Sequence, residues 1–188
     1  MEFELDAKST ALVSIDLQYS NVARKLAPHT AGEVVENSAM LAQAVREKGG
    51  TVVFVRVLVN EIPQLPADAP FPRGNGTTPP NASELVPEAG GQPGDVVVTK
   101  RQWGAFYGTD LELQLQRRGI RTIILGGIAT NIGVESTARS AFDRGYELVF
   151  AEDAMTSTGA EAHDFSVQQL FPRMGRVRSA EQIAASLR

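Results

Sequence analysis

The stretch Thr122-Ile-Ile-Leu-Gly-Gly-Ile128, followed directly by Ala129-Thr-Asn-Ile-Gly133, decides the fold of this chain. Its first seven residues form a continuous apolar run, which is typical of a strand buried on both faces of a sheet. The residues after the run, from about Asn131 to Arg144, have a helical pattern that stops before Gly145. A buried strand that leads into a helix is the repeating unit of parallel α/β proteins.

The same alternation continues on both sides of this unit. Further strands are expected at residues 10–16, 51–59, 95–100, 147–153 and 176–178. Further helices are expected at residues 31–48, 109–118 and 158–171 and after residue 179, each with the capping-box spacing of Ser or Thr to Glu or Gln at its start. The pattern predicts an α/β fold, a three-layer α/β/α sandwich around a six-stranded, mainly parallel, Rossmann-like sheet.

The composition predicts one globular domain over residues 1–188 and excludes several function classes. Hydrophobic residues make up 43% of the 188 residues and charged residues 21%, which is close to the average for globular proteins. The net charge of −4 argues against nucleic acid and anionic membranes as partners. The absence of cysteine excludes disulfides, thiolate metal sites and thiol nucleophiles. The acidic N-terminus and the lack of a long apolar run predict a cytoplasmic protein without membrane spans.

The segment at about 60–94 has no clear periodicity and holds eight of the ten prolines. One interpretation is a linker between domains, but neither side of it is a complete domain. A long ordered loop over the ends of the strands is the favoured interpretation, because such loops in compact domains usually carry function.

Polar side chains stand where the predicted strands end. Asp16 closes the first strand, with Gln18 two residues further on, and Lys100 closes the strand at 95–100. Ligands of parallel sheets bind outside the carboxyl ends of the strands, so these residues are candidates for an active site. Asp16 would be an acid or base that Lys100 keeps ionised; the alternatives are a helix cap or structural ion pair for Asp16 and a solvated surface position for Lys100.

The turn between Gly127 and Gly133 is a candidate binding site for an oxygen atom. The first N–H groups of a helix have no partners within it and favour an anion or oxyanion. Asn131 is expected to cap this helix. The alternative is that the glycines only allow a tight turn and close packing.

Other residues carry weaker signals. Trp103, Phe106 and Tyr107 would wall a pocket above Lys100 or pack the following helix. Glu152 and Asp153 are expected to cap or pair locally, and His163 to form hydrogen bonds on a helix surface. The chain has only two histidines, His29 and His163, and their distance in the sequence predicts no metal-ligand cluster.

Three segments resemble the isochorismatase-like hydrolases, and in particular a subgroup without the catalytic cysteine. They are residues 11–18 (Ala-Leu-Val-Ser-Ile-Asp-Leu-Gln), Lys100 before Arg-Gln-Trp-Gly-Ala-Phe-Tyr-Gly-Thr-Asp-Leu, and residues 126–141 (Gly-Gly-Ile-Ala-Thr-Asn-Ile-Gly-Val-Glu-Ser-Thr-Ala-Arg-Ser-Ala). The match runs in order from about residue 8 to 185. It implies the isochorismatase-like hydrolase fold and a homo-oligomer, a dimer or tetramer.

The resemblance also implies roles for individual residues. The family's catalytic Asp and Lys fall on Asp16 and Lys100, its nucleophilic Cys on Gly133, and its non-proline cis peptide on Ile128–Ala129. The amidase branch uses the Asp to activate the Cys, with backbone N–H groups as the oxyanion hole, and Gly133 closes that thioester route. The isochorismatase branch also has Gly here and hydrolyses an enol ether with an acid and water.

At two positions the sequence differs from the family in ways that restrict the expected substrate and cofactor. Isochorismatases carry a Tyr where this chain has Ala129, which argues against isochorismate as the substrate. Nicotinamidase-type members carry an Asp-x-His metal pattern where this chain has residues 56–59 (Arg-Val-Leu-Val), so we expect no zinc and no other cofactor.

The leading hypothesis is a hydrolase of a small, carboxylated metabolite that works without a Cys nucleophile. Asp16 is the acid or base, Lys100 its electrostatic partner, Gly133 marks the position of the family Cys, and water is the nucleophile. The residues expected to bind the substrate are Gln18, Trp103, Ile128, Ala129 and Asn131. The alternative is a non-catalytic small-molecule binder or scaffold with the same fold. A phosphate-binding signalling domain is not supported, because the chain has neither an acidic cluster nor a phosphate loop.

Overall fold

A computed structural model describes residues 3–70 and 78–188. Its centre is a six-stranded sheet in the order β3-β2-β1-β4-β5-β6, and all neighbouring strands are parallel. The strands are β1 (Thr10–Ile15), β2 (Thr51–Val57), β3 (Val96–Lys100), β4 (Thr122–Ile128), β5 (Glu147–Thr156) and β6 (Gly175–Arg178). The predicted fold class is confirmed, and the order reverses direction between β1 and β4, where parallel sheets place their ligands.

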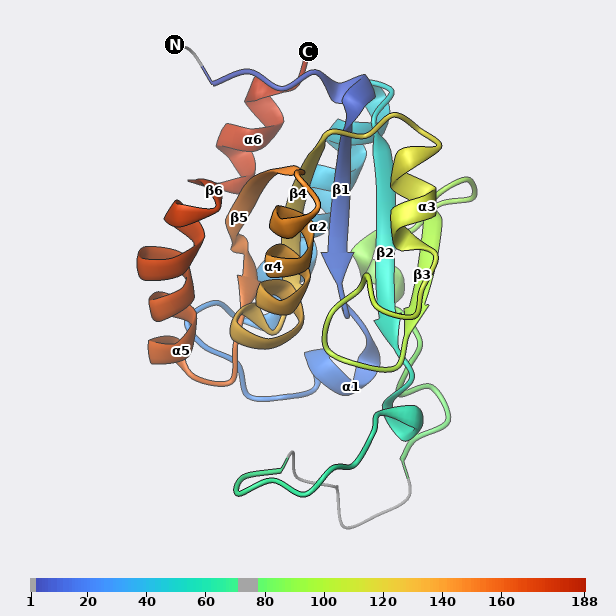
Figure 1. Cartoon of the computed structure of the whole chain (residues 1–188), viewed down its shortest axis with the longest axis vertical. Helices are drawn as coiled ribbons and strands as arrows, with labels where there is room; N and C mark the ends of the chain where they lie inside the picture. Colours follow the sequence, from blue (N-terminus) through green and yellow to red (C-terminus); the bar gives the residue numbers. More distant parts are fainter. Residues whose placement is uncertain (1–2, 71–77) are drawn as a thin grey trace.

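Helices cover both faces of the sheet (Figure 1). One face packs against α2 (Ala31–Glu47) and α6 (Ala180–Ser186), and the other against α3 (Leu111–Gln116) and α4 (Glu135–Asp143). Strand side chains alternate between the two apolar clusters: Leu12 lies in the first, and its neighbour Val13 lies in the second. Both faces are therefore apolar, which explains the uninterrupted runs in the sequence.

Two of the four predicted capping boxes form. Thr30 caps α2 with Glu33, and Ser179 caps α6 with Gln182. The prediction is wrong for α3, which begins at Leu111, because the Glu112 carboxylate pairs with Arg144 at 3.1 Å and does not return to Thr109.

Helix α5 and strand β5 also differ from the predicted elements. The helix α5 (Ala160–Phe165) begins after Gly159, so the predicted cap by Thr158 is also wrong. Strand β5 runs three residues beyond its predicted end at 153. Its pairing with β4 shifts between Leu125 and Gly127, and this irregularity brings Met155 opposite Gly127.

The proline-rich segment returns to the carboxyl end of the sheet, at the lower edge in Figure 1. Leu85 forms an antiparallel bridge with Gln18, and the Val86 N–H donates to the Leu17 carbonyl at 3.0 Å. Residues 71–77 of the predicted loop lie outside the described residues. Of the described part of the loop, residues 82–86 therefore lie against the segment that follows β1.

Candidate active site

Asp16 follows β1 directly and turns its side chain over the end of the sheet. Its φ of 53° is left-handed, a conformation that residues other than glycine rarely adopt and that clusters at functional sites. The backbone is held there by three hydrogen bonds: the Asp16 N–H donates to Val55 at 2.8 Å, and its carbonyl accepts from the Gln18 N–H and the Asn21 amide.

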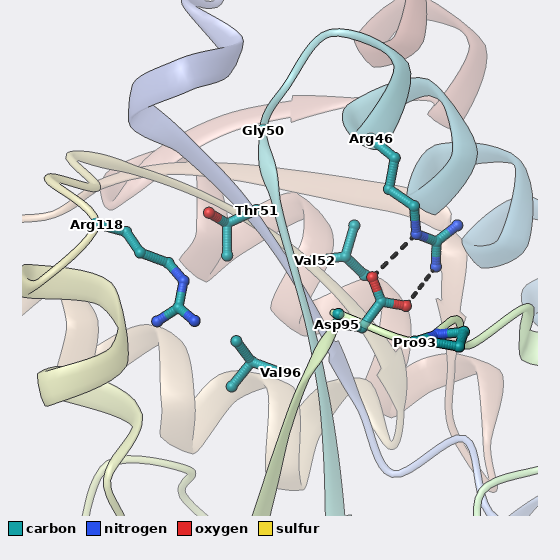
Figure 2. Close-up of a pocket in the computed structure, with 9 residues that line it drawn as sticks. Arg46, Gly50, Thr51, Val52, Pro93, Asp95, Val96 and Arg118 are labelled. Carbon is teal, nitrogen blue, oxygen red and sulfur yellow. Dashed lines mark hydrogen bonds and ion pairs between the residues drawn. The ribbon is translucent and has the colours of Figure 1, made fainter.

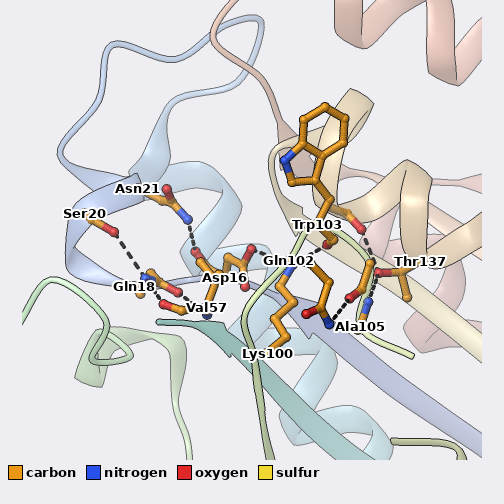
Figure 3. Close-up of polar contacts among 12 residues, drawn as sticks. Asp16, Gln18, Ser20, Asn21, Val57, Lys100, Gln102, Trp103, Ala105 and Thr137 are labelled. Carbon is orange, nitrogen blue, oxygen red and sulfur yellow. Dashed lines mark hydrogen bonds and ion pairs between the residues drawn. The ribbon is translucent and has the colours of Figure 1, made fainter. Parts of the chain in front are cut away.

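Lys100, the last residue of β3, reaches Asp16 across the ends of β1 and β2 (Figure 3). The Nζ atom of Lys100 lies 2.9 Å from Asp16 Oδ2. The Lys100 side chain is 1% exposed and the Asp16 side chain is 8% exposed. The same ammonium donates to the Trp103 carbonyl at 2.5 Å. Asp16 Oδ1 is buried and has no hydrogen-bond partner among the described residues, so one oxygen of this carboxyl is left unsatisfied.

Burial controls the protonation of Asp16. It raises the pKa of the carboxyl to about 6 from an ordinary 3.8, although the charge and the hydrogen bond of Lys100 lower it in part. Desolvation outweighs the attraction to Lys100, but a pKa of about 6 still leaves most of the Asp16 carboxyl ionised at pH 7. Both forms of the carboxyl are accessible near neutral pH, so one group can donate or accept a proton.

Gly133 faces this ion pair. A Cβ built on it would lie 3.4 Å from Asp16 Oδ2, 3.2 Å from Lys100 Nζ and 2.9 Å from Ile15 Cγ2. The predicted meeting of Asp16, Lys100 and Gly133 at the carboxyl ends of the strands is thus confirmed. Glycine therefore lets the backbone approach the pair closely, because even a Cβ at this position would press against Ile15 and Lys100.

The turn before Gly133 brings β4 against β1. Gly127 has a φ of 119°, and a Cβ there would lie 2.1 Å from the Ile15 carbonyl, so only glycine allows this approach. The Ile128–Ala129 peptide is cis, as the resemblance implies. A π-helical turn, η4 (Thr130–Val134), then leads into α4.

The predicted substrate-binding residues differ in what the structure leaves available. Gln18 is fully buried, and its amide contacts Ser20, Val57 and Ala82, so it positions the loop instead of offering a free amide. The Ile128 side chain lies in the apolar core, as does that of Ala129. Asn131 does not cap the helix as predicted, because its Oδ1 accepts from the Ser157 hydroxyl at 2.6 Å.

Trp103 and Thr137 frame the other side of the site. Trp103 is half exposed, and Figure 3 shows its indole above the Lys100 side chain. Thr137, which sequence reasoning missed, accepts from the Ala105 N–H at 3.1 Å and donates to the Gly133 carbonyl at 2.7 Å. Its spacing of four residues from Gly133 on a helix was the available signal.

The histidine prediction is wrong on two counts. His163 is 2% exposed, not on a helix surface, and its Nδ1 lies 2.8 Å from the Thr130 hydroxyl. The fold also brings it to His29 and Glu152: one ligand atom from each of the three lies within 4.8 Å of the others. Distance in the sequence hid this cluster, because parallel strands join remote segments.

Two surface pockets lie away from these residues. The pocket in Figure 2 has a volume of about 290 Å³ and lies at the amino ends of β2 and β3, where Arg46 pairs with Asp95 at 2.6 Å. The second, of about 270 Å³, is lined by Phe54 and the segment 85–91. Neither pocket is lined by Asp16, Lys100 or Gly133.

The comparisons with known proteins agree with the observed fold. The model of the Isochorismatase domain matches residues 10–182. The isochorismatase family protein YecD of Escherichia coli O157:H7 is 50% identical over 98% of this chain and 99% of its own. A segment of 79 residues, 42% of this chain and 31% of the relative, is 46% identical to the ureidoacrylate amidohydrolase RutB of Variovorax paradoxus.

A solved structure shows the same architecture. The isochorismatase family protein of Burkholderia thailandensis superposes with a TM-score of 0.91 and 41% identity, covering 99% of this chain and 98% of the other. Within the described residues, no helix has the length and apolar character needed to cross a membrane. From the matched domain and these relatives, the chain belongs to the isochorismatase family.

Proposed function

We propose that this protein is a hydrolase of a small, carboxylated metabolite, with Asp16 as the acid or base and water as the nucleophile. The observation that carries the proposal is the buried Asp16–Lys100 pair in front of Gly133, with Asp16 Oδ1 left without a partner among the described residues. A buried, unpartnered carboxylate oxygen has an energetic cost, and such costs are typical of sites that bind a ligand. The family relationship supports hydrolysis, since RutB is an amidohydrolase by name.

The proposed reaction needs no thiol. In the hydrolysis of an amide-type bond, Asp16 takes a proton from water as the water oxygen attacks the substrate carbon, and then gives that proton to the leaving nitrogen. In the hydrolysis of an enol ether, protonated Asp16 gives its proton to the vinyl carbon, and water adds to the resulting oxocarbenium carbon and returns a proton to Asp16. The hemiketal or hemiacetal then breaks its C–O bond to give a carbonyl compound and an alcohol. In both reactions the Lys100 ammonium balances negative charge. The backbone N–H groups of Ala129 and Gly133 are the proposed donors to a substrate oxygen.

Replacement of Asp16 by asparagine tests this role. Asp16→Asn keeps the shape but cannot exchange a proton, so kcat should fall by about 10²–10⁴-fold while the substrate Kd changes little. Lys100→Met should lower kcat and also weaken substrate binding, because it removes the positive charge that attracts an anionic substrate. Activity against a panel of amides, ureides and enol ethers measures these effects, and Asp143→Asn, an exposed carboxylate on α4, is the matched control.

The pH dependence of kcat/KM separates the two reactions. If Asp16 acts as a base, the rate rises as pH increases through about 6; if it acts as an acid, the rate falls over the same range. Full activity in Asp16→Asn, or inactivation of the wild type by iodoacetamide, would contradict the proposal. No turnover of any substrate, together with ligand binding that needs Lys100, would favour the non-catalytic binder.

We also propose a homo-oligomer, a dimer or tetramer, in the cytoplasm. Large apolar side chains are exposed on two helices that cover the same face of the sheet, and a second copy would shield them. These side chains are Leu113 on α3 and Phe142 on α4.

A further inference from the structure

A second group of polar side chains lies at the carboxyl edge of the sheet, outside the Asp16 site. His29 comes from the loop before α2, Glu152 from β5 and His163 from α5, and Figure 1 shows that loop passing beneath the lower ends of β5 and α5. From the geometry of these three side chains, we infer that they form a binding site for one divalent transition-metal ion of the Zn²⁺ type.

The donor set fits such an ion. Two imidazoles and one carboxylate are a recognised set for Zn²⁺ and related ions, whereas Mg²⁺ and Ca²⁺ prefer oxygen donors alone. His29 Nε2 and Glu152 Oε2 are 3.5 Å apart, which is about the separation of two donors on one Zn²⁺ at bond lengths of roughly 2.0–2.2 Å. The third donor, from His163, lies within 4.8 Å of the other two.

His163 is held in the orientation that a ligand needs. Its Nδ1 contacts the Thr130 hydroxyl at 2.8 Å, which leaves Nε2 as the ring atom available to an ion. Metal-binding histidines almost always use their second nitrogen in this way.

The loop that carries His29 is also fixed before an ion binds. Ala27 and Ser157 exchange two backbone hydrogen bonds, at 2.8 and 3.1 Å, and the Thr156 hydroxyl donates to the His29 carbonyl at 2.8 Å. Less conformational entropy is then lost on binding. His29 and Glu152 are partly exposed, at 28% and 39% of their side chains, so solvent has a route to the site. The ion would join the loop, β5 and α5.

The experiment uses tag-free, full-length protein and Zn²⁺ alone. Calorimetric titration should give one Zn²⁺ per chain, and Co²⁺ should give the visible d–d bands of a nitrogen- and oxygen-ligated ion. At a free Zn²⁺ concentration about 100 times Kd, the melting temperature should rise by roughly 5–10 °C. Because the chain has only two histidines, the imidazole ¹⁵N signals in NMR report on both ligands without ambiguity.

Variants separate the site from general metal adsorption. His29→Gln and Glu152→Gln change partly exposed side chains, so they should fold and lose at least tenfold in affinity. His163→Gln should also lose Zn²⁺ binding. Because His163 is buried, the effect of this substitution on folding is measured at the same time. Glu161→Gln, an exposed carboxylate on α5, and Asp16→Asn should bind Zn²⁺ like the wild type.

The inference is overturned if Zn²⁺ leaves both imidazole signals and the melting temperature unchanged. It is also overturned if His29→Gln and Glu152→Gln bind Zn²⁺ as tightly as the wild type, since the histidines would then form only the ion pair and the hydrogen bond seen here. Neither result depends on turnover, so the outcome is independent of the proposed hydrolase function.

Discussion

At the scale of single residues, Asp16 combines three unfavourable features in one position. Its backbone is left-handed, its carboxyl is buried, and one of its oxygens has no partner among the described residues. Each feature costs free energy, and a structure keeps such costs where a function requires them. Lys100 offsets part of the cost of the buried charge, but the raised pKa shows that it does not offset all of it.

This balance predicts how the stability of the protein depends on pH. The pKa of Asp16 is about 6 in the folded protein and 3.8 ordinarily, so the folded state holds the proton more tightly. Stability from this group is present below pH 4 and is lost as pH rises through 6, by about 3 kcal/mol. Asp16→Asn cannot ionise, so its melting temperature relative to the wild type should increase by roughly 6–12 °C between pH 4 and pH 7.5.

Thermal melts of wild type and variant over this range measure the difference. The control Asp143→Asn, at an exposed carboxylate, should follow the wild-type curve at every pH. A constant difference between wild type and Asp16→Asn would show that the Asp16 pKa is not raised.

Gly133 predicts a second effect at this scale. Gly133→Ala places a Cβ 2.9 Å from Ile15 Cγ2 and 3.2 Å from Lys100 Nζ, so the neighbours must move. We expect at least a tenfold loss of kcat/KM, with the protein still folded. Gly133→Cys adds the family's thiol beside Asp16 at the same steric cost, and it should not rescue the native reaction. Kinetics with circular dichroism as the folding control test both, and wild-type activity in Gly133→Ala would remove Gly133 from the site.

At the scale of elements, three strand ends and one helix start build the site. The end of β1 provides Asp16, the end of β3 provides Lys100, and the turn from β4 into η4 provides Gly133. Thr137 on α4 ties the loop after β3 to this turn through its contacts with Ala105 and Gly133. The helix therefore holds both walls of the site at a constant separation.

Thr137→Val tests this connection. The variant keeps the shape of the side chain but leaves the buried Ala105 N–H without its partner, at a cost of about 1–3 kcal/mol. The melting temperature should fall, and KM should rise because the loop that carries Trp103 is no longer fixed. Ser140→Ala on the same helix is the control and should change neither quantity; an unchanged KM in Thr137→Val would restrict Thr137 to a structural role.

At the scale of the whole molecule, assembly is the open prediction. Apolar side chains on α3 and α4 remain in solvent in the single chain, and burying them requires an interface of more than roughly 1,000 Å² in total. Light scattering at micromolar concentration should give two or four times the chain mass of 20.2 kDa. Phe142→Glu, in the exposed part of α4, should shift the particle towards a monomer, whereas Lys48→Glu, at the end of α2, should not. A wild-type mass near 20 kDa would contradict the prediction.

Local sequence patterns were enough to predict the sheet, most of the helices and the residues at the strand ends. A strand that is buried on both faces has a continuous run of apolar residues, which a local pattern reveals. The capping boxes of α2 and α6 depend on residues three positions apart, so they too are local. Resemblance to a family then assigned Asp16, Lys100 and Gly133 to one site.

The environment of each of these groups depends on the tertiary structure. Burial outweighs the charge of Lys100 in setting the Asp16 pKa, the Gln18 amide is bonded to the loop, and Thr137 reaches the site from α4. His29 and His163 are 134 positions apart in the chain, yet they meet beside Glu152 because parallel strands place remote segments at one edge. Desolvation and contact between remote residues depend on the arrangement of all the elements, and no local pattern in the sequence records them.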